Sequence, residues 1–285
     1  MLRIPLPAAL VEQAAAYASG ALEPAEPRNA ATVVLLRPSS SGPEVYLLRR
    51  QASMAFAAGM CVFPGGGVDP RDFDADVAWA GPPPSAWASS LGTDEATARA
   101  LVCAAVRETF EESGVLLAGT SPSSVVSDTT GEDWEADRVA LESRSVSFTA
   151  FLASRGLVVR TDLLGAWSGW LTPVFEPRRY RTWFFVAALP DGQVTRDVSS
   201  ESSAVTWLGA QDAAARVDAG ELLMLPPTYL TCLEVGLYDS PAAVLDAAAA
   251  REPVEMFMPE VEGTGSSATL SIPPSLRALV EERLS

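Results

Sequence analysis

The residues with the clearest chemical potential are four charged side chains close together, Arg107, Glu108, Glu111 and Glu112. In a helix of about 3.6 residues per turn the three glutamates share one face. The preceding segment, 100–106, is apolar on all sides and predicts a buried helix. Carboxylates that emerge from a buried helix repel one another and resist loss of water, and a divalent cation would remove both costs. The alternative is a solvated acidic face that pairs with arginines.

The composition excludes several other kinds of catalysis. The 285 residues include 20 cationic side chains, all of them arginine, 36 acidic ones and no histidine, so the net charge is −16. A chain without histidine or lysine has no Ser-His-Asp machinery, no lysine Schiff base, no Walker-type phosphate loop and no histidine zinc site. What remains for catalysis is carboxylates, arginines, hydroxyls, one thiol at a time and a hard metal held by oxygen. Oxygen ligands suit Mg²⁺ or Mn²⁺.

Composition also bounds the partners and the compartment. The acidic balance argues against nucleic acid and against anionic membranes. No apolar run is long enough for a transmembrane helix, and residues 1–20 are typical of an amphipathic helix and not of a signal peptide. Three cysteines far apart fit a reducing compartment. We therefore expect a cytoplasmic protein with a small-molecule partner; a homodimer is left open.

The segment 107–115 resembles the second half of the Nudix box. It reads Arg-Glu-Thr-Phe-Glu-Glu-Ser-Gly-Val, with Thr109 at the usually aliphatic position. The first half is found upstream as Phe-Pro-Gly-Gly at 63–66, and Asp72 stands where the family has glutamate. Residues 73–106 replace a much shorter stretch, so an insertion splits the box. The sequence is thus identified as a member of the Nudix superfamily.

A subgroup of this family is built with the same split. This chain resembles the peroxisomal coenzyme A diphosphatase group of animals in the run that continues through Leu117, in Trp-Leu-Thr-Pro at 170–173 and in Pro-Arg-Arg-Tyr at 177–180. The resemblance covers roughly residues 30–240. The absence of lysine and the alanine-rich composition indicate a bacterial member of that group.

The order of elements favours an α+β protein, because strands and helices do not alternate regularly. The resemblance implies the Nudix fold, a mixed β-sheet sandwiched between helices, as one domain over 1–285. We expect an N-terminal helical extension over 1–28, a surface excursion at the insertion 73–94, and extra helices over 211–285. The strongest predicted helix covers 93–113, with Thr93 as its N-cap and Gly114 at its end.

The resemblance assigns roles to the box residues. Glu108, Glu111 and Glu112 would bind Mg²⁺ or Mn²⁺, and Arg107 would form a salt bridge that holds the helix against the glycine loop. Gly65 and Gly66 would let the backbone pass close to that helix. The partner of Asp72 is left open.

Four further residues are candidates outside the box. Arg50 ends a predicted strand upstream of the glycine loop and is either a surface arginine or a contact for substrate phosphates. Arg178 and Arg179 either form surface ion pairs or bind phosphate. Glu201, on a loop ahead of a short strand, is either an ordinary loop acid or a base or extra ligand facing the metal.

The resemblance implies metal-dependent hydrolysis of a pyrophosphate bond in a substrate that carries a nucleoside diphosphate, and these residues can support that mechanism. Subgroup resemblance makes coenzyme A or an acyl derivative the best single candidate, cleaved to 3′,5′-ADP and phosphopantetheine. Dinucleotides, ADP-ribose and nucleotide sugars are alternatives within the same class. A different kind of function is a catalytically silent Nudix domain that binds a nucleotide and regulates a partner, which the loss of any of the three glutamates would have favoured.

Overall fold

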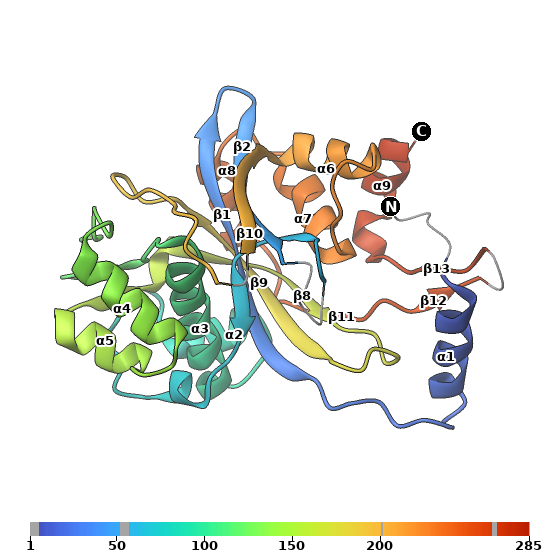
Figure 1. Ribbon diagram of the computed structural model, residues 1–285, viewed down its shortest axis with the longest axis horizontal. Coiled ribbons are helices and arrows are strands. Elements are labelled where there is room, and N and C mark those ends of the chain that lie inside the picture. Colours follow the sequence, from blue (N-terminus) through green and yellow to red (C-terminus); the bar gives the residue numbers. More distant parts are fainter. Residues whose placement is uncertain (1–5, 52–56, 201, 264–266, 285) are drawn as a thin grey trace.

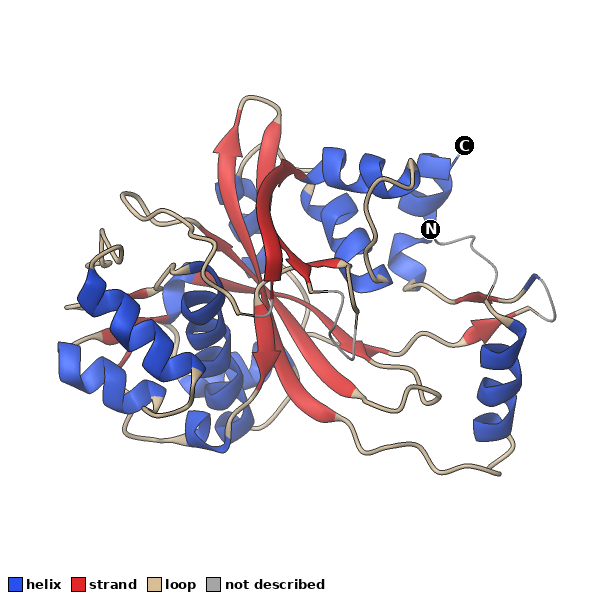
Figure 2. Cartoon of the chain, viewed as in Figure 1, coloured by secondary structure: helices blue, strands red, loops and turns tan. Residues whose placement is uncertain are grey.

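A mixed sheet runs through the centre of the computed structural model, which describes residues 6–51, 57–200, 202–263 and 267–284. Its main strands are β1 (Arg28–Ser39), β2 (Gly42–Arg50), β8 (Leu164–Leu171), β9 (Tyr180–Ala188), β10 (Ser202–Gly209) and β11 (Met256–Phe257). They lie in the order β10-β2-β1-β9-β8-β11 (Figures 1 and 2). β1 is parallel to β9 and β8 to β11, whereas β2 is antiparallel to both its neighbours, so the sheet is mixed.

β1 shows why this sheet needs helices on both faces. Successive side chains of a strand point to opposite faces. Ala31, Val33 and Leu35 join one apolar core, whereas Val34 and Leu36 join the other. All five are fully buried. A strand that is apolar on both sides must lie between two helical layers.

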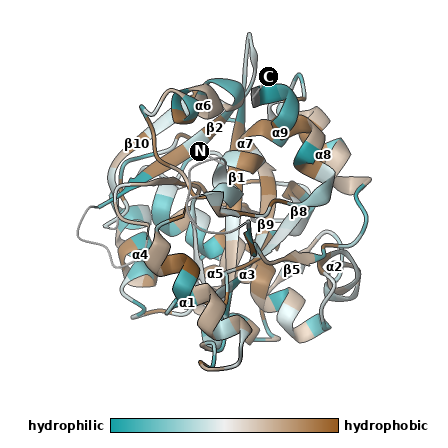
Figure 3. Ribbon diagram, turned by 90° about the vertical axis from the view of Figure 1, so that its right-hand side faces the viewer, coloured by the Kyte–Doolittle hydropathy of each residue, from teal (hydrophilic) through white to brown (hydrophobic). Residues whose placement is uncertain are grey.

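The helices provide those layers. One face is covered by α3 (Glu95–Ser113), together with α2 (Pro84–Leu91), α4 (Glu132–Glu142) and α5 (Phe148–Arg155). The opposite face is covered by α6 (Ala210–Asp218), α7 (Pro226–Val235), α8 (Pro241–Ala249) and α9 (Arg277–Leu284) (Figure 1). Figure 3 shows polar residues mostly at the periphery of this arrangement. The predicted α+β fold with a sheet between helices is confirmed.

Short elements complete the chain. β3 (Cys61–Val62) pairs with β2 and β4 (Gly65–Gly67) pairs with β1. A small separate sheet has the order β5 (Trp79–Ala80), β7 (Val158–Arg160) and β6 (Ala118–Gly119). The N-terminal helix α1 (Ala8–Ala18) lies beside the hairpin of β12 (Val261–Glu262) and β13 (Thr269–Leu270) (Figure 1). None of the described helices has the length and apolar character needed to cross a membrane.

The insertion 73–94 is a structural part of the core, so its expectation as a surface excursion is wrong. Val77, Ala80, Trp87 and Leu91 are all buried in the core beneath α3. The Leu91 carbonyl also accepts a 2.9 Å hydrogen bond from the indole of Trp183 in the central sheet. Proline- and serine-rich composition indicated an exposed loop, but the apolar residues spaced along it pack inward.

The helix that carries the carboxylates begins one residue later than predicted. Asp94, and not Thr93, is its N-cap, and the Asp94 carboxylate accepts the Thr97 backbone N–H at 2.9 Å. The helix ends at Gly114, as predicted, in a left-handed conformation with φ 75°.

Trp87 tests the structural role of the insertion. Its ring is 5% exposed and lies 5.9 Å from the ring of Phe185, measured between centroids. We expect Trp87→Ala to lower the free energy of unfolding by about 3–5 kcal/mol, because it leaves a cavity in the core. Chemical denaturation measures the loss. The exposed Ser85 of the same helix is the control, and Ser85→Ala should change stability by less than about 0.5 kcal/mol. Equal stabilities of the two variants would restore the surface interpretation.

Candidate active site

A buried ion pair brings the two halves of the split box together. The Arg107 guanidinium donates to both carboxylate oxygens of Asp72, from Nε at 3.1 Å and from Nη2 at 3.0 Å. The exposed fractions of the two side chains are 10% and 2%. A two-pronged contact of this kind fixes orientation as well as distance. The open question about the partner of Asp72 is thereby answered.

The turn that carries Asp72 is prepared for this contact. Asp69 and Asp72 form a capping box at the short 3₁₀ helix Pro70–Phe73: the Asp72 carboxylate accepts the Asp69 backbone N–H at 2.8 Å, and the Asp69 carboxylate accepts the Arg71 N–H at 2.9 Å. The Arg71 side chain also binds Asp69 and holds the pKa of that carboxyl down at about 2. These contacts fix the position of Asp72, so its carboxylate is already oriented for the contact with Arg107.

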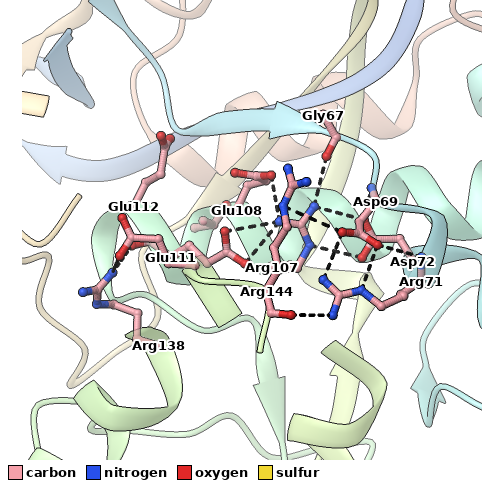
Figure 4. A network of polar contacts seen from close by, with 12 residues as sticks. Gly67, Asp69, Arg71, Asp72, Arg107, Glu108, Glu111, Glu112, Arg138 and Arg144 are labelled. Atoms are coloured by element: carbon pink, nitrogen blue, oxygen red, sulfur yellow. Dashed lines mark hydrogen bonds and ion pairs between the residues drawn. The ribbon is translucent and has the colours of Figure 1, made fainter. Parts of the chain in front are cut away.

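Arg107 also holds two of the three glutamates. Its Nη1 donates to Glu108 at 2.7 Å and to Glu111 at 3.1 Å, and its Nη2 donates to the Gly67 carbonyl at 3.1 Å (Figure 4). Burial by itself would lower the pKa of Arg107, but the carboxylate charges around it raise the pKa above its ordinary value. The predicted link between Arg107 and the glycine loop is present in this geometry.

The glycine loop lies directly against the carboxylates. The Gly65 N–H donates to Glu112 at 2.7 Å. A Cβ on Gly66 would lie 2.5 Å from the Glu108 carboxylate, so no other residue fits there without displacement. Gly65, Gly66 and Gly67 pair with Thr32, Ala31 and Ala30 of β1, respectively, and the sheet thus carries the loop to the helix.

The carboxylates carry more negative charge than Arg107 neutralises. Burial, and then the charge of Glu108, raise the pKa of Glu111 to about 7 even though Arg107 opposes this shift. Carboxylates forced together in this way fit a hard divalent cation. Within the described residues, no three acidic or thiol side chains converge as they stand on one metal position. Glu108 and Glu111 are bound to Arg107, whereas the Glu112 side chain extends away from that guanidinium (Figure 4). A cation would therefore compete with Arg107 for Glu108 and Glu111.

The loop before β10 reaches the same end of α3. Glu201, the predicted base or extra ligand, lies outside the described residues. Its neighbours are held in place: Gln51 donates to the Ser200 carbonyl at 2.8 Å, and Ser202 pairs with Arg50 across the sheet. Arg50 is half-buried at this edge of the sheet, and its contact with substrate phosphates stays a prediction.

The arginines after β8 differ from each other. Arg178 is exposed. Arg179 is 8% exposed, and its guanidinium donates to the carbonyls of Thr172 at 3.1 Å and Ala25 at 3.0 Å. As it stands, Arg179 ties the turn between β8 and β9 to the segment before β1. Phosphate binding by either arginine stays a prediction.

Sequence reasoning missed Arg138 of α4. This side chain is buried, and its Nη1 donates to the Glu111 backbone carbonyl at 2.8 Å (Figure 4). Glutamates three residues before it and four residues after it, Glu135 and Glu142, are the only sequence signal, and that spacing is common on solvated helices.

The pair between Asp72 and Arg107 should be important for stability. Asp72→Ala leaves a buried guanidinium with one partner fewer, and we expect a loss of about 3 kcal/mol in the free energy of unfolding. Denaturant titration of the metal-free protein measures it. Asp76, an exposed aspartate of the same loop, provides the control Asp76→Ala. A loss no greater than that of the control would show that the two halves of the box are not held together by this contact.

The raised pKa of Glu111 predicts that the stability of the folded protein depends on pH. Because its pKa is higher in the folded protein than in the unfolded chain, the folded state binds more protons between about pH 4.5 and 7, and stability falls as pH rises through this window. In the presence of a chelator, Glu111→Gln should therefore gain stability relative to wild type between pH 5 and pH 8. Thermal unfolding across this range measures the difference. A difference that does not change with pH would contradict the assignment of an unbalanced charge.

Known proteins resemble this chain in sequence and in fold. The family model described as the NUDT19 Nudix domain matches residues 86–234. The match begins inside α2 and does not include the glycine loop, which the Asp72–Arg107 contact joins to the helix.

Two curated relatives are named acyl-coenzyme A diphosphatase NUDT19. The Gallus gallus protein is 27% identical over 71% of this chain and 66% of its own length, and the Xenopus laevis protein 25% identical over 67% and 59%. A Caenorhabditis elegans protein named for the nudix hydrolases is 27% identical over 70% of this chain and 57% of its own. This chain thus spans between 57% and 66% of the length of these relatives.

A solved structure, a NUDIX hydrolase from Alicyclobacillus acidocaldarius, is 26% identical and superposes with a TM-score of 0.67 over 81% of this chain and 98% of that chain. The family model covers more than half of the sequence, and the fold resembles that of this solved NUDIX hydrolase. The chain belongs to the Nudix hydrolase family, with a Nudix domain of the NUDT19 type.

Proposed function

We propose that the protein hydrolyses a pyrophosphate bond in a small substrate that contains a nucleoside diphosphate, with Mg²⁺ or Mn²⁺ as cofactor. The observation that carries the proposal is the buried contact of Arg107 with Asp72. It holds the last turns of α3, which carry the three glutamates, against the glycine loop. No other charged cluster in the described residues matches the family motif.

Glu108, Glu111 and Glu112 would hold the cation. When bound, the cation supplies positive charge to the phosphoryl oxygens and eases ionisation of the attacking water. Arg107 keeps the backbone of the helix at the loop, and the Gly65 N–H orients Glu112. A carboxylate close to the cluster would accept the proton of the water, and we assign this role to Glu201.

The remaining positive charges for an anionic substrate come from arginine, because the chain has no lysine and no histidine. We assign phosphate binding to Arg50, Arg178 and Arg179 together with the backbone of Gly65 and Gly66. Arg50 is favoured by its place beside the loop that leads to β10.

Coenzyme A or an acyl-coenzyme A is the substrate we propose. Water adds to the pyrophosphate, and the products are 3′,5′-ADP and phosphopantetheine or its acyl form. The support is the NUDT19 family model and the names of the vertebrate relatives. Because this chain spans only part of those proteins, a dinucleotide, ADP-ribose or a nucleotide sugar is kept as a second substrate group for the same site. We place the reaction in the cytoplasm.

The decisive assay exposes the protein to this panel with Mg²⁺ or Mn²⁺. We expect coenzyme A cleavage that a chelator abolishes and that Glu112→Gln lowers by at least about 100-fold, since the substitution removes a charge that acts on the cation. Product formation is followed by chromatography. Glu95→Gln, an exposed position at the start of the same helix, should retain full activity.

Other outcomes of this assay would change the assignment of the substrate, of the metal site or of the enzyme itself. Cleavage of a different panel member would keep the site and replace the substrate. Full activity in chelator or in Glu112→Gln would refute the metal-site assignment. If nothing is cleaved, while nucleotide binding is seen by calorimetry, the silent regulatory domain replaces the enzyme.

A further inference from the structure

The loop between β9 and β10 is fastened to the end of the carboxylate helix. The Arg196 backbone N–H donates to the Ser113 carbonyl at 2.9 Å. The buried Tyr46 hydroxyl of β2 donates to the Arg196 carbonyl, also at 2.9 Å. These two bonds fix the Arg196 backbone at the end of the helix that carries Glu112. Their effect is to hold the beginning of this loop at the carboxylate cluster.

At the other end of the loop, a carboxylate of α4 holds Ser200 in addition to the Gln51 side chain. Glu142, the last residue of α4, accepts hydrogen bonds on Oε1 from the Ser200 backbone N–H at 3.1 Å and from the Ser200 hydroxyl at 2.5 Å. Its second oxygen, Oε2, accepts Nη1 of Arg138 at 3.0 Å. The same Arg138 nitrogen donates to the Glu111 backbone carbonyl at 2.8 Å. Glu142 and Arg138 therefore connect Ser200 to the backbone of a candidate metal ligand.

The fold depends more on Arg138 than on Glu142. The Arg138 side chain is 4% exposed and also binds Glu135 through Nε and Nη2, so its removal would deprive the buried Glu111 carbonyl of this donor and take a partner from both Glu135 and Glu142. The Glu142 side chain is 26% exposed. Without Glu142, Arg138 would keep Glu135 and the Glu111 carbonyl. Loss of Glu142 would thus leave the Ser200 N–H and hydroxyl without this acceptor, while Gln51 still holds the Ser200 carbonyl and α3 and α4 stay together.

We propose that Glu142 is a positioning residue, which holds the loop before β10 in register with the carboxylates of α3. The inference rests on the proposed function, because the position of the loop affects turnover only if the reaction takes place at those carboxylates. Small displacements of groups around a reacting centre reduce turnover strongly, even where they hardly affect the fold. Glu142 does not touch the cluster itself and acts through Ser200 and Arg138.

The test compares Glu142→Ala with Glu142→Gln and with Glu132→Ala, an exposed glutamate at the start of the same helix. In Glu142→Ala we expect kcat to fall by about 10- to 100-fold, with KM changed by less than about twofold. Glu142→Gln keeps an oxygen that can accept from Ser200 and should recover most of kcat. Glu132→Ala should behave as wild type, and all three should unfold within a few degrees of it.

Hydrogen exchange provides a readout that does not depend on activity. The Ser200 amide should lose protection in Glu142→Ala, while the amides of α3 keep theirs. Unchanged protection at Ser200, or an unchanged kcat in an active enzyme, would overturn the proposal. If wild type cleaves no member of the substrate panel, the proposed function fails, and the exchange of Ser200 still decides whether Glu142 holds the loop. Ser200→Ala, which removes only the hydroxyl, is the second variant should Glu142→Ala not fold.

Discussion

The structure of the site depends on one buried guanidinium. Arg107 contacts Asp72, Glu108, Glu111 and the carbonyl of Gly67, so one side chain joins a loop, a helix and a strand edge. Burying a charge is costly unless every donor finds an acceptor, and here nearly all the donors of the fork are used. Arg107 pairs with three carboxylates, and a fourth, that of Glu112, lies at the same end of the helix. The protein thus keeps an excess of negative charge where the family motif predicts a cation.

The insertion that divides the motif does not disturb this site, because it forms part of the core. Trp87 and Leu91 lie under α3, and the Leu91 carbonyl binds the indole of Trp183 in the central sheet. Asp72 stands at the start of the insertion and Arg107 follows it, yet the two side chains meet. A long insertion is tolerated because its own apolar residues are buried, and the cost of closing a longer loop rises only slowly with length.

Rigidity at the end of α3 is supplied by α4. Arg138 reaches across to the Glu111 carbonyl, and Arg196 pairs with Glu135 of the same helix at 2.7 Å. The guanidinium of Arg196 also lies against Gly114, where a Cβ would come within 2.8 Å of it. Gly114 therefore has two roles at the end of α3. It adopts the left-handed conformation, and it leaves room for the Arg196 guanidinium. Polar contacts thus join the loop that carries Arg196, the end of α3 and α4 beside the carboxylates.

The sequence by itself determined the fold class, the buried helix and the family. Helical period, apolar runs and the Glu108, Glu111 and Glu112 spacing are local properties, which can be recognised without knowledge of the tertiary contacts. Only the tertiary structure decided the partner of Asp72, the burial of the insertion and the role of Arg138. Each of these depends on contacts between residues far apart in the chain, and one arginine resembles another in sequence until packing decides whether its guanidinium meets a carboxylate, a carbonyl or water.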